Sequence, residues 1–338
     1  MPDEPNSTDE PITTDEPITT DEPTTPDGVS RGVATDVSDE VATDIADQPG
    51  KAPERARSEF SRAWARFRHN KVALISLIFV GLLILIAIFG PFFMPYGVSE
   101  QDILRRLEPM GSPGHPLGTD PLGRDLMTRL VYSLRSALTI GFVAEALSLG
   151  FALLIGMAAG YLGGRWEAVL MFFTDIMFAF PRYLFAIILV VAMGQGLWTI
   201  IIAISVASWV GQARLARAQA LKVKNYSFVE AGRSMGARGT TLVMRYILPN
   251  SWGPLLVTTS FGIPAAIAAE TGLAILGLGV QPPTPTWGGM IMDGYNYVLG
   301  VPHLIVWPLL LFSLTMLAFT FIGDGFRDAF DVSEEEQA

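Results

Sequence analysis

The sequence has no cysteine, only three histidines and little charge. The absence of cysteine excludes disulfides, thiolate metal sites and a cysteine nucleophile. His69, His115 and His303 are too far apart in the sequence to suggest a metal cluster. Charged residues make up 17% of the 338 residues and hydrophobic ones 50%, whereas a soluble domain carries roughly 25% charged residues. Together with several long apolar runs, this deficit excludes a soluble enzyme and indicates a membrane protein.

The net negative charge of the chain comes from its first part. Residues 1–50 contain 14 Asp and Glu against a single Arg, a net charge of −13, while residues 51–338 sum to +3. Within 8–25 a six-residue unit, TDEPIT, occurs three times with small changes. With so few large apolar residues this segment cannot form a core, so we expect a disordered acidic tail. One interpretation of such acidity is a halophilic prokaryotic host with a very salty cytoplasm.

Apolar runs beyond this tail predict an all-α membrane protein with six transmembrane helices. A basic juxtamembrane segment at 51–71 precedes the first run, and an outer loop at 94–137 follows it. Five further helices fall within a core domain at 138–323, and a cytoplasmic tail covers 324–338. The predicted spans are Val72–Phe93, Leu138–Gly160, Val169–Gly194, Leu197–Ala213, Leu255–Leu278 and Leu304–Ile322.

The distribution of Lys and Arg predicts the orientation in the membrane. With both termini in the cytoplasm, the inner segments carry fifteen Lys and Arg and the outer loops carry five. Within the first outer loop, Asp120 followed by Pro121 resembles a helix start. Leu122, Leu126 and Leu130 then recur at helical spacing. We therefore expect an amphipathic helix on the outer surface, separate from the second span.

A polar segment between the fourth and fifth spans has the pattern of a short helical hairpin. It belongs to the inner loop 214–250. Ser227 and Glu230 have the spacing of a capping box, Gly236 suits the left-handed end of a first helix, and Pro249 lies near the end of a second. On these grounds alone, Glu230 could serve only as a cap and Gly236 only as a helix terminator.

The hairpin resembles the EAA loop of ABC importer permeases in Glu230-Ala231, Gly236 and Leu248-Pro249, with Gly232 where the family more often has Ala. Two further segments resemble the C-type permease of dipeptide and oligopeptide importers. One is the GTDxxGRD signature, which comprises Gly118, Thr119, Asp120, Gly123, Arg124 and Asp125. The other is the closing GDxLRDxLD motif, here Gly323, Asp324, Arg327 and Asp328. The segment from Leu273 to Gly288 also resembles this family.

The resemblance implies a type I ABC importer permease fold and the function of one permease subunit. In that family the EAA loop docks onto a cytoplasmic ATPase. The implied partners are a second homologous permease, one or two ATPase subunits, an extracellular substrate-binding protein and membrane lipid, without nucleic acid. The implied cargo is dipeptides or oligopeptides, with nickel chelates or oligosaccharides as alternatives.

The sequence has no phosphate-binding loop of the type G-x-x-x-x-G-K-[ST]. We therefore expect no enzymatic activity and no bound cofactor in this chain, with ATP and Mg²⁺ used by partner ATPases. A secondary transporter driven by an ion gradient is a second hypothesis, but it leaves the EAA-like loop without a role. A membrane scaffold without transport is a third.

Ionisable residues within the predicted spans are candidates for function, because charges in a membrane are unfavourable unless they are used or paired. Glu145, Asp175, Arg182 and Glu270 are the four. Asp175 and Arg182 are seven residues apart, so on one continuous helix they would share a face and could pair, with Pro181 kinking the helix between them. Asp175, Arg182 and Glu270 are therefore candidates for the translocation path, although mutual neutralisation or a polar contact with a partner permease is the more economical explanation.

Overall fold

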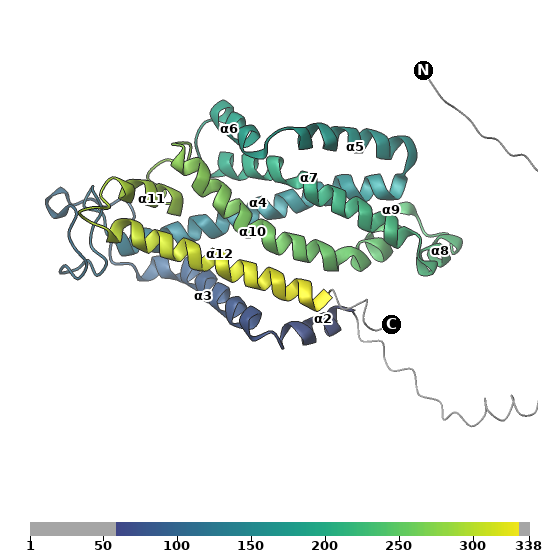
Figure 1. Cartoon of the computed structure of the whole chain (residues 1–338), viewed down its shortest axis with the longest axis horizontal. Coiled ribbons are helices and arrows are strands. Elements are labelled where there is room, and N and C mark those ends of the chain that lie inside the picture. The colour runs from purple at the N-terminus through teal and green to yellow at the C-terminus, as the bar shows by residue number, and fades with distance from the viewer. Residues whose placement is uncertain (1–58, 331–338) are drawn as a thin grey trace, which may run out of the picture. The chain divides into compact units, whose positions relative to one another are not determined.

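The computed structural model describes residues 59–330, and within this range every regular element is a helix (Figure 1). The predicted acidic tail at 1–50, residues 51–58 and the last residues of the chain lie outside the described part. The helices are α2 (Glu59–Phe67), α3 (Lys71–Phe93), η1 (Ile103–Arg105), α4 (Leu126–Leu162), α5 (Gly164–Ala179), α6 (Arg182–Met193), α7 (Leu197–Lys224), α8 (Ser227–Ser234), α9 (Gly239–Leu242), η2 (Val243–Ile247), η3 (Pro249–Ser251), α10 (Trp252–Ile275), α11 (Trp287–Tyr295) and α12 (His303–Phe330).

Five of these helices are long and apolar enough to cross a membrane, and a bent pair makes up to a sixth span. The five are α3, α4, α7, α10 and α12, each of which contains most of one predicted apolar run. The all-α class is thereby confirmed, and the six predicted spans agree with the structure when the bent pair is counted as one span. Two helices end later than the predicted spans. Helix α7 continues past Ala213 to Lys224, and α12 continues into the predicted tail as far as Phe330.

The third predicted span, Val169–Gly194, is not one continuous helix. It consists of α5 and α6, which meet at an angle of 87°. Phe180, the residue between α5 and Pro181, has extended backbone angles (φ −81°, ψ 132°). A residue before proline is disfavoured in the helical conformation, and proline lacks the N–H that a continuing helix needs. Pro181 was expected to kink the helix, but here it ends one helix and starts another.

The prediction of a separate amphipathic helix in the first outer loop is also wrong. The helix begins at Leu126, where the Asp125 carboxylate accepts a 2.7 Å hydrogen bond from the Thr128 backbone N–H. Asp120 and Pro121 precede the helix rather than start it. From Leu126 the helix runs without a break through the second span to Leu162, 37 residues in all. At ~1.5 Å per residue it is about 55 Å long, well beyond the ~30 Å hydrocarbon core of a bilayer.

Helices α4 and α7 pack along each other more extensively than any other pair. Small residues make this approach possible. A β-carbon at Gly156 would overlap the Ala213 carbonyl, and one at Gly160 would lie 2.6 Å from the Ala220 β-carbon. Gly–Ala contacts of this kind let helix backbones approach closely inside a membrane, where apolar burial alone gives little driving force.

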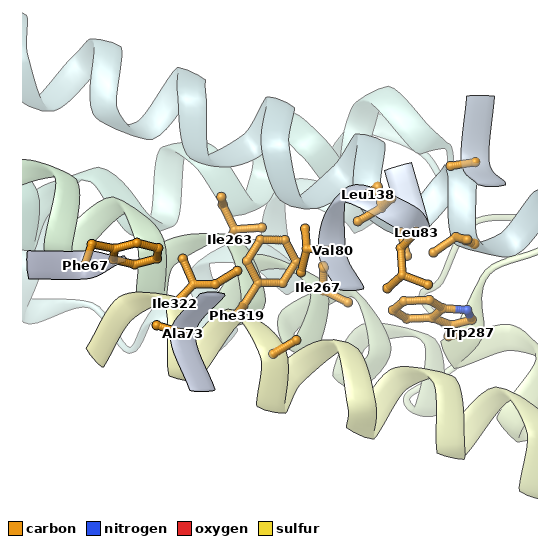
Figure 2. Close-up of a cluster of buried hydrophobic side chains, with 14 of the residues drawn as sticks. Phe67, Ala73, Val80, Leu83, Leu138, Ile263, Ile267, Trp287, Phe319 and Ile322 are labelled. Atoms are coloured by element: carbon orange, nitrogen blue, oxygen red, sulfur yellow. The ribbon is translucent and has the colours of Figure 1, made fainter. Parts of the chain in front are cut away.

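A second apolar core joins α3, α10 and α12 (Figure 2). Phe319 and Ile322 of α12 contribute to it beside Ile263 and Ile267 of α10. Phe67 closes one end of this cluster and stacks on Phe326 at a centroid distance of 4.7 Å. The opposite face of α3 exposes further large apolar side chains. A helix that is apolar all round is typical of a membrane span, because lipid covers the face that protein does not.

Candidate functional site

The hairpin at 225–251 lies at one end of the helix bundle, where α8 and α9 are joined by a turn (Figure 1). Gly236 has φ +83°, which confirms its expected left-handed conformation after α8. The expected capping box is wrong. Tyr226 occupies the N-cap position and makes no side-chain cap, so Ser227 is already the first helical residue. The second helix is short, and it continues as a π-helical turn at η2 instead of extending as regular α-helix to Pro249.

The EAA-like residues divide into exposed and buried positions. Glu230, Ala231, Gly236 and Pro249 are exposed, Leu248 is half-buried, and Gly232 is buried. A β-carbon at Gly232 would lie 3.3 Å from both Leu242 and Tyr246, so this position faces the second limb of the hairpin. Several large apolar side chains of the hairpin are exposed as well. The hairpin surface, as we call it, consists of Glu230 together with Tyr226, Phe228, Met235 and Met244.

The inner side of the hairpin is firmly attached to the bundle. Val229, Leu242 and Ile247 are buried in one cluster with residues of α4, α7 and α10. The Lys224 ammonium group donates a 2.6 Å hydrogen bond to the Tyr161 carbonyl at the end of α4. Exposed apolar side chains and a carboxylate on a hairpin that packs against the bundle are suited to docking another protein.

The GTDxxGRD signature forms a compact turn at the opposite end of the bundle. Gly118 and Gly123 both have positive φ, and a β-carbon at either would overlap backbone of residues 102–109. Between them, the Thr119 hydroxyl donates to the Arg105 carbonyl at 2.5 Å and accepts from the Glu108 N–H at 2.9 Å. Arg105 and Glu108 form a half-buried ion pair at 2.8 Å, and the hydrogen bond from Arg105 lowers the pKa of Glu108. The signature therefore holds the loop before α4 in one conformation.

The charged members of the signature are buried and paired with one another. Asp120 accepts from Arg124 Nε at 2.5 Å and lies 3.4 Å from Arg129 Nε. Asp293 of α11 lies 3.8 Å from Arg124 and 3.9 Å from Arg129. Asp125, the N-cap of α4, also pairs with His115 at 2.9 Å. Sequence reasoning missed Asp293, because no local pattern connects α11 with the start of α4.

The closing motif connects the two ends of the described chain. Gly325 lets α12 approach α2 and α3, because a β-carbon there would overlap that of Ala73. Gly323 packs on the ring of Phe261 in α10. The Asp328 carboxylate accepts a 3.5 Å hydrogen bond from Asn70, and Asp324 and Arg327 lie on the exposed side of α12. Here the glycines of the motif are packing positions.

The intramembrane candidates do not come together. Asp175 pairs with Arg214 of α7 at 2.6 Å, not with Arg182, because the bend at Pro181 separates the two residues. Arg182 is exposed at the start of α6. Glu270 is 1% exposed and contacts the hydroxyl of Thr286, the N-cap of α11. The expected pairing of Asp175 with Arg182 is thus wrong, whereas a place for Asp175, Arg182 or Glu270 on the translocation path stays a prediction.

Glu145, the fourth intramembrane charge, is buried where α4, α7 and α10 meet. It is 3% exposed and accepts a hydrogen bond from Gln212 of α7. Gly262 of α10 faces its carboxylate. Gln212 was not anticipated as a partner, although a polar side chain within a predicted span, here near its end, is a usable signal for one.

Comparisons with known proteins give a consistent picture. The family described as "Binding-protein-dependent transport system inner membrane component" matches residues 152–333. That described as "N-terminal TM domain of oligopeptide transport permease C" matches residues 58–109.

Among curated proteins, the dipeptide transport system permease protein DppC of Bacillus subtilis is 40% identical over 270 residues, covering 80% of this chain and 84% of that protein. The oligopeptide transport system permease protein OppC of the same organism is 38% identical, covering 83% and 92%. The glutathione transport system permease protein GsiD of Pectobacterium atrosepticum is 37% identical, covering 81% and 91%. Among solved structures, the inward-facing MetNI methionine ABC transporter matches with a TM-score of 0.50 and 19% identity, over 60% of this chain and 97% of that one.

Proposed function

The chain belongs to the family of binding-protein-dependent transport system inner membrane components, the permease subunits of ABC importers, and we propose that its cargo is dipeptides and oligopeptides. It is an integral membrane protein. The relatives at 38–40% identity, which carry dipeptides and oligopeptides by name, support this cargo over the nickel chelates and oligosaccharides that the motifs also allow. In this proposal the chain forms half of the path and a second homologous permease forms the other half.

The hairpin surface is the proposed contact with a cytoplasmic ATPase. It supports this role because Glu230 and its apolar neighbours are exposed while the inner side is fixed to α4, α7 and α10. ATP and Mg²⁺ would be bound by the partner subunits, and this chain would neither bind nor hydrolyse ATP. Movement of the docked ATPases would reach the spans through the hairpin, and an extracellular binding protein would deliver the peptide.

The proposed orientation places both termini, and therefore the hairpin, in the cytoplasm. The excess of Lys and Arg in the segments on that side supports it. The signature turn and α11 would then lie on the outer side, where a binding protein docks. A cysteine introduced by Thr240→Cys, at an exposed hairpin position outside the proposed contact, would react with a membrane-impermeant thiol reagent only in inverted vesicles.

The assembled complex offers a direct test of cargo. We would purify it from native membranes, reconstitute it with its binding protein, and measure ATP-dependent uptake of labelled dipeptides, an oligopeptide, glutathione, a nickel chelate and an oligosaccharide. Saturable peptide uptake that requires ATP supports the proposal. Uptake of the chelate or the oligosaccharide without uptake of peptides would contradict the peptide cargo and identify that compound as the cargo instead. Peptide uptake driven by an ion gradient in the absence of ATP would contradict the importer mechanism.

A further inference from the structure

A cavity of about 180 Å³ lies between the start of α4, the segment 277–286 and α11. Its polar lining comes from Arg129, Gln281, Thr284, Thr286 and Asp293. Ala274, Val280 and Met292 supply apolar lining. The volume corresponds to about six water molecules at ~30 Å³ each, enough for the terminal residue of a peptide. None of the roles described so far uses this cavity.

Arg129 is the charged group of the cavity with unused hydrogen-bonding capacity. The residue is 6% exposed, and its Nη1 atom is buried without a hydrogen-bond partner. The Asp120 carboxylate lies closer to Arg124 than to Arg129. The distance from its Oδ2 to the Nε atom is 2.5 Å for Arg124 and 3.4 Å for Arg129. A buried guanidinium N–H without an acceptor is unfavourable, so the position calls for an acceptor that the described residues do not provide.

The Asp293 carboxylate offsets the positive charge of Arg124 and Arg129 but accepts no hydrogen bond from either guanidinium group. Its carboxylate lies 3.8 Å from Arg124 and 3.9 Å from Arg129, beyond hydrogen-bonding distance, and its side chain is 53% exposed. A group that reaches Arg129 more closely could therefore displace Asp293 toward solvent. A carboxylate fits this position best, because its two oxygens match the planar fork of a guanidinium.

We propose that this cavity binds the free carboxylate end of a peptide, with Arg129 as the group that recognises it. The inference rests on the proposed peptide cargo and names one subsite for it. The hydroxyl of Thr284 and the amide oxygen of Gln281, whose amide nitrogen donates to Gln195, are available to the peptide bond, and the apolar lining is available to the last side chain. Asp293 competes with the bound carboxylate for Arg129 and so limits its affinity.

The absence of cysteine from this chain allows a direct binding assay. Thr284→Cys places one thiol at a half-buried position of the cavity wall. We would purify the full-length variant with its partner subunits and measure the rate at which a maleimide modifies this chain, read by mass. The probes are the dipeptide Ala-Ala, the same dipeptide with an amidated C-terminus, and acetate.

We expect Ala-Ala to slow the modification and the amide to require about tenfold or more higher concentration, since one charge-assisted interaction is lost. Two substitutions in the Thr284→Cys background should act in opposite directions. Arg129→Gln should abolish protection, whereas Asp293→Asn should lower the half-protecting concentration because it removes the competing charge. A purely structural role of this cluster would make both variants worse.

Equal protection by acid and amide would overturn the proposal, as would absence of protection by either. Protection by acetate at the same concentration would overturn the peptide assignment and leave a general carboxylate site. Protection by the extracellular binding protein alone would reassign the cavity to that partner. ATP-driven uptake of Ala-Ala is measured in parallel. Uptake without protection rejects this subsite but keeps the peptide importer, whereas loss of both rejects the cargo itself.

Discussion

The carboxylate of Glu145 occupies the space that a side chain at residue 262 would fill. Glu145 belongs to α4 and Gly262 to α10, and Gln212 of α7 donates a hydrogen bond to the same carboxylate. The glycine thereby forms a recess for a buried charge where three membrane-spanning helices meet. Only a glycine at position 262 leaves room for the Glu145 carboxylate in this arrangement.

Gly262→Ala should lower the stability of the purified complex. A methyl group there displaces the Glu145 carboxylate from Gln212, and overpacking of this kind typically costs about 1–3 kcal/mol. The measurement is the melting temperature in mild detergent. The matched control is Gly150→Ala in α4, whose β-carbon would have no neighbour within 4 Å. It should be neutral or slightly stabilising, because alanine is the better helix former. Equal destabilisation by both would disprove the recess.

Asp120→Asn should destabilise the outer end of the bundle strongly. It removes the partner of two buried guanidinium groups, and breaking a buried ion pair typically costs about 3–5 kcal/mol. Limited proteolysis of the loop 94–125, together with the melting temperature, measures the effect. Glu108→Gln removes one charge of the partly solvent-exposed pair with Arg105 and serves as the control, with a smaller change expected than for the fully buried Asp120. A large effect of the control alone would reverse this ranking.

Glu230→Ala should weaken coupling without unfolding the chain. Glu230 is exposed, so its loss should change stability by less than about 0.5 kcal/mol. We expect fewer ATPase subunits to copurify, and less stimulation of ATP hydrolysis by binding protein and peptide. Thr240→Ala, an exposed hairpin position outside the motif, should leave both unchanged. Normal stimulation in the Glu230 variant would exclude this carboxylate from the contact.

The two glycines of the hairpin should respond differently to alanine. Gly236→Ala forces a β-carbon into the left-handed conformation at φ +83°, which costs about 1–2 kcal/mol. Gly232→Ala introduces contacts of 3.3 Å with Leu242 and Tyr246, and these offset a gain in helix propensity of about 1 kcal/mol. We expect thermal unfolding to show a loss for the first and little change for the second. A loss that is larger at Gly232 would show that the hairpin limbs cannot adjust.

Peptide binding at Arg129 should strengthen as the pH falls toward the raised pKa of Asp293. Partial burial raises the pKa of Asp293, against the opposing pull of Arg129 and Arg124 and with a further rise from Asp120. Asp293 therefore takes up a proton at higher pH than an ordinary aspartate and ceases to compete, while a peptide carboxylate, with a pKa of about 3.3–3.7, stays ionised. Protection of the Thr284→Cys thiol measures this. The Asp293→Asn variant should lose the pH dependence, and a dependence that persists there would have another cause.

Apolar patterning located the spans well, because the composition of a run reports directly whether lipid can surround it. The runs at Val72–Phe93 and Leu304–Ile322 correspond to α3 and α12. The left-handed conformation of Gly236 was also predicted correctly, because that conformation depends mainly on the residue type at the position itself. Helix starts were less predictable. Asp120 and Asp125 are both good caps locally, and the packing of the signature turn decides between them.

Partners of charged residues could not be predicted from spacing. Asp175 and Arg182 share a face only if their helix continues, and the break at Pro181 gives Asp175 to Arg214 instead. Asp293 and Arg129 are joined only by the packing of α11 against α4. Such pairs depend on tertiary contacts between distant segments, for which one sequence carries no periodic signal.

Helix α7 has a mechanical consequence for transport. It runs for 28 residues from the membrane to the hairpin without a break, and α8 follows after two residues. At ~1.5 Å per residue it is a rod about 42 Å long, so a tilt of about 10° at the hairpin displaces its far end by roughly 7 Å. Because Asp175 and Glu167 bind Arg214 and Arg217 of this rod, α5 would swing with it. A rotation of about 10° at the hairpin would thus move the other end of α7 by several ångströms.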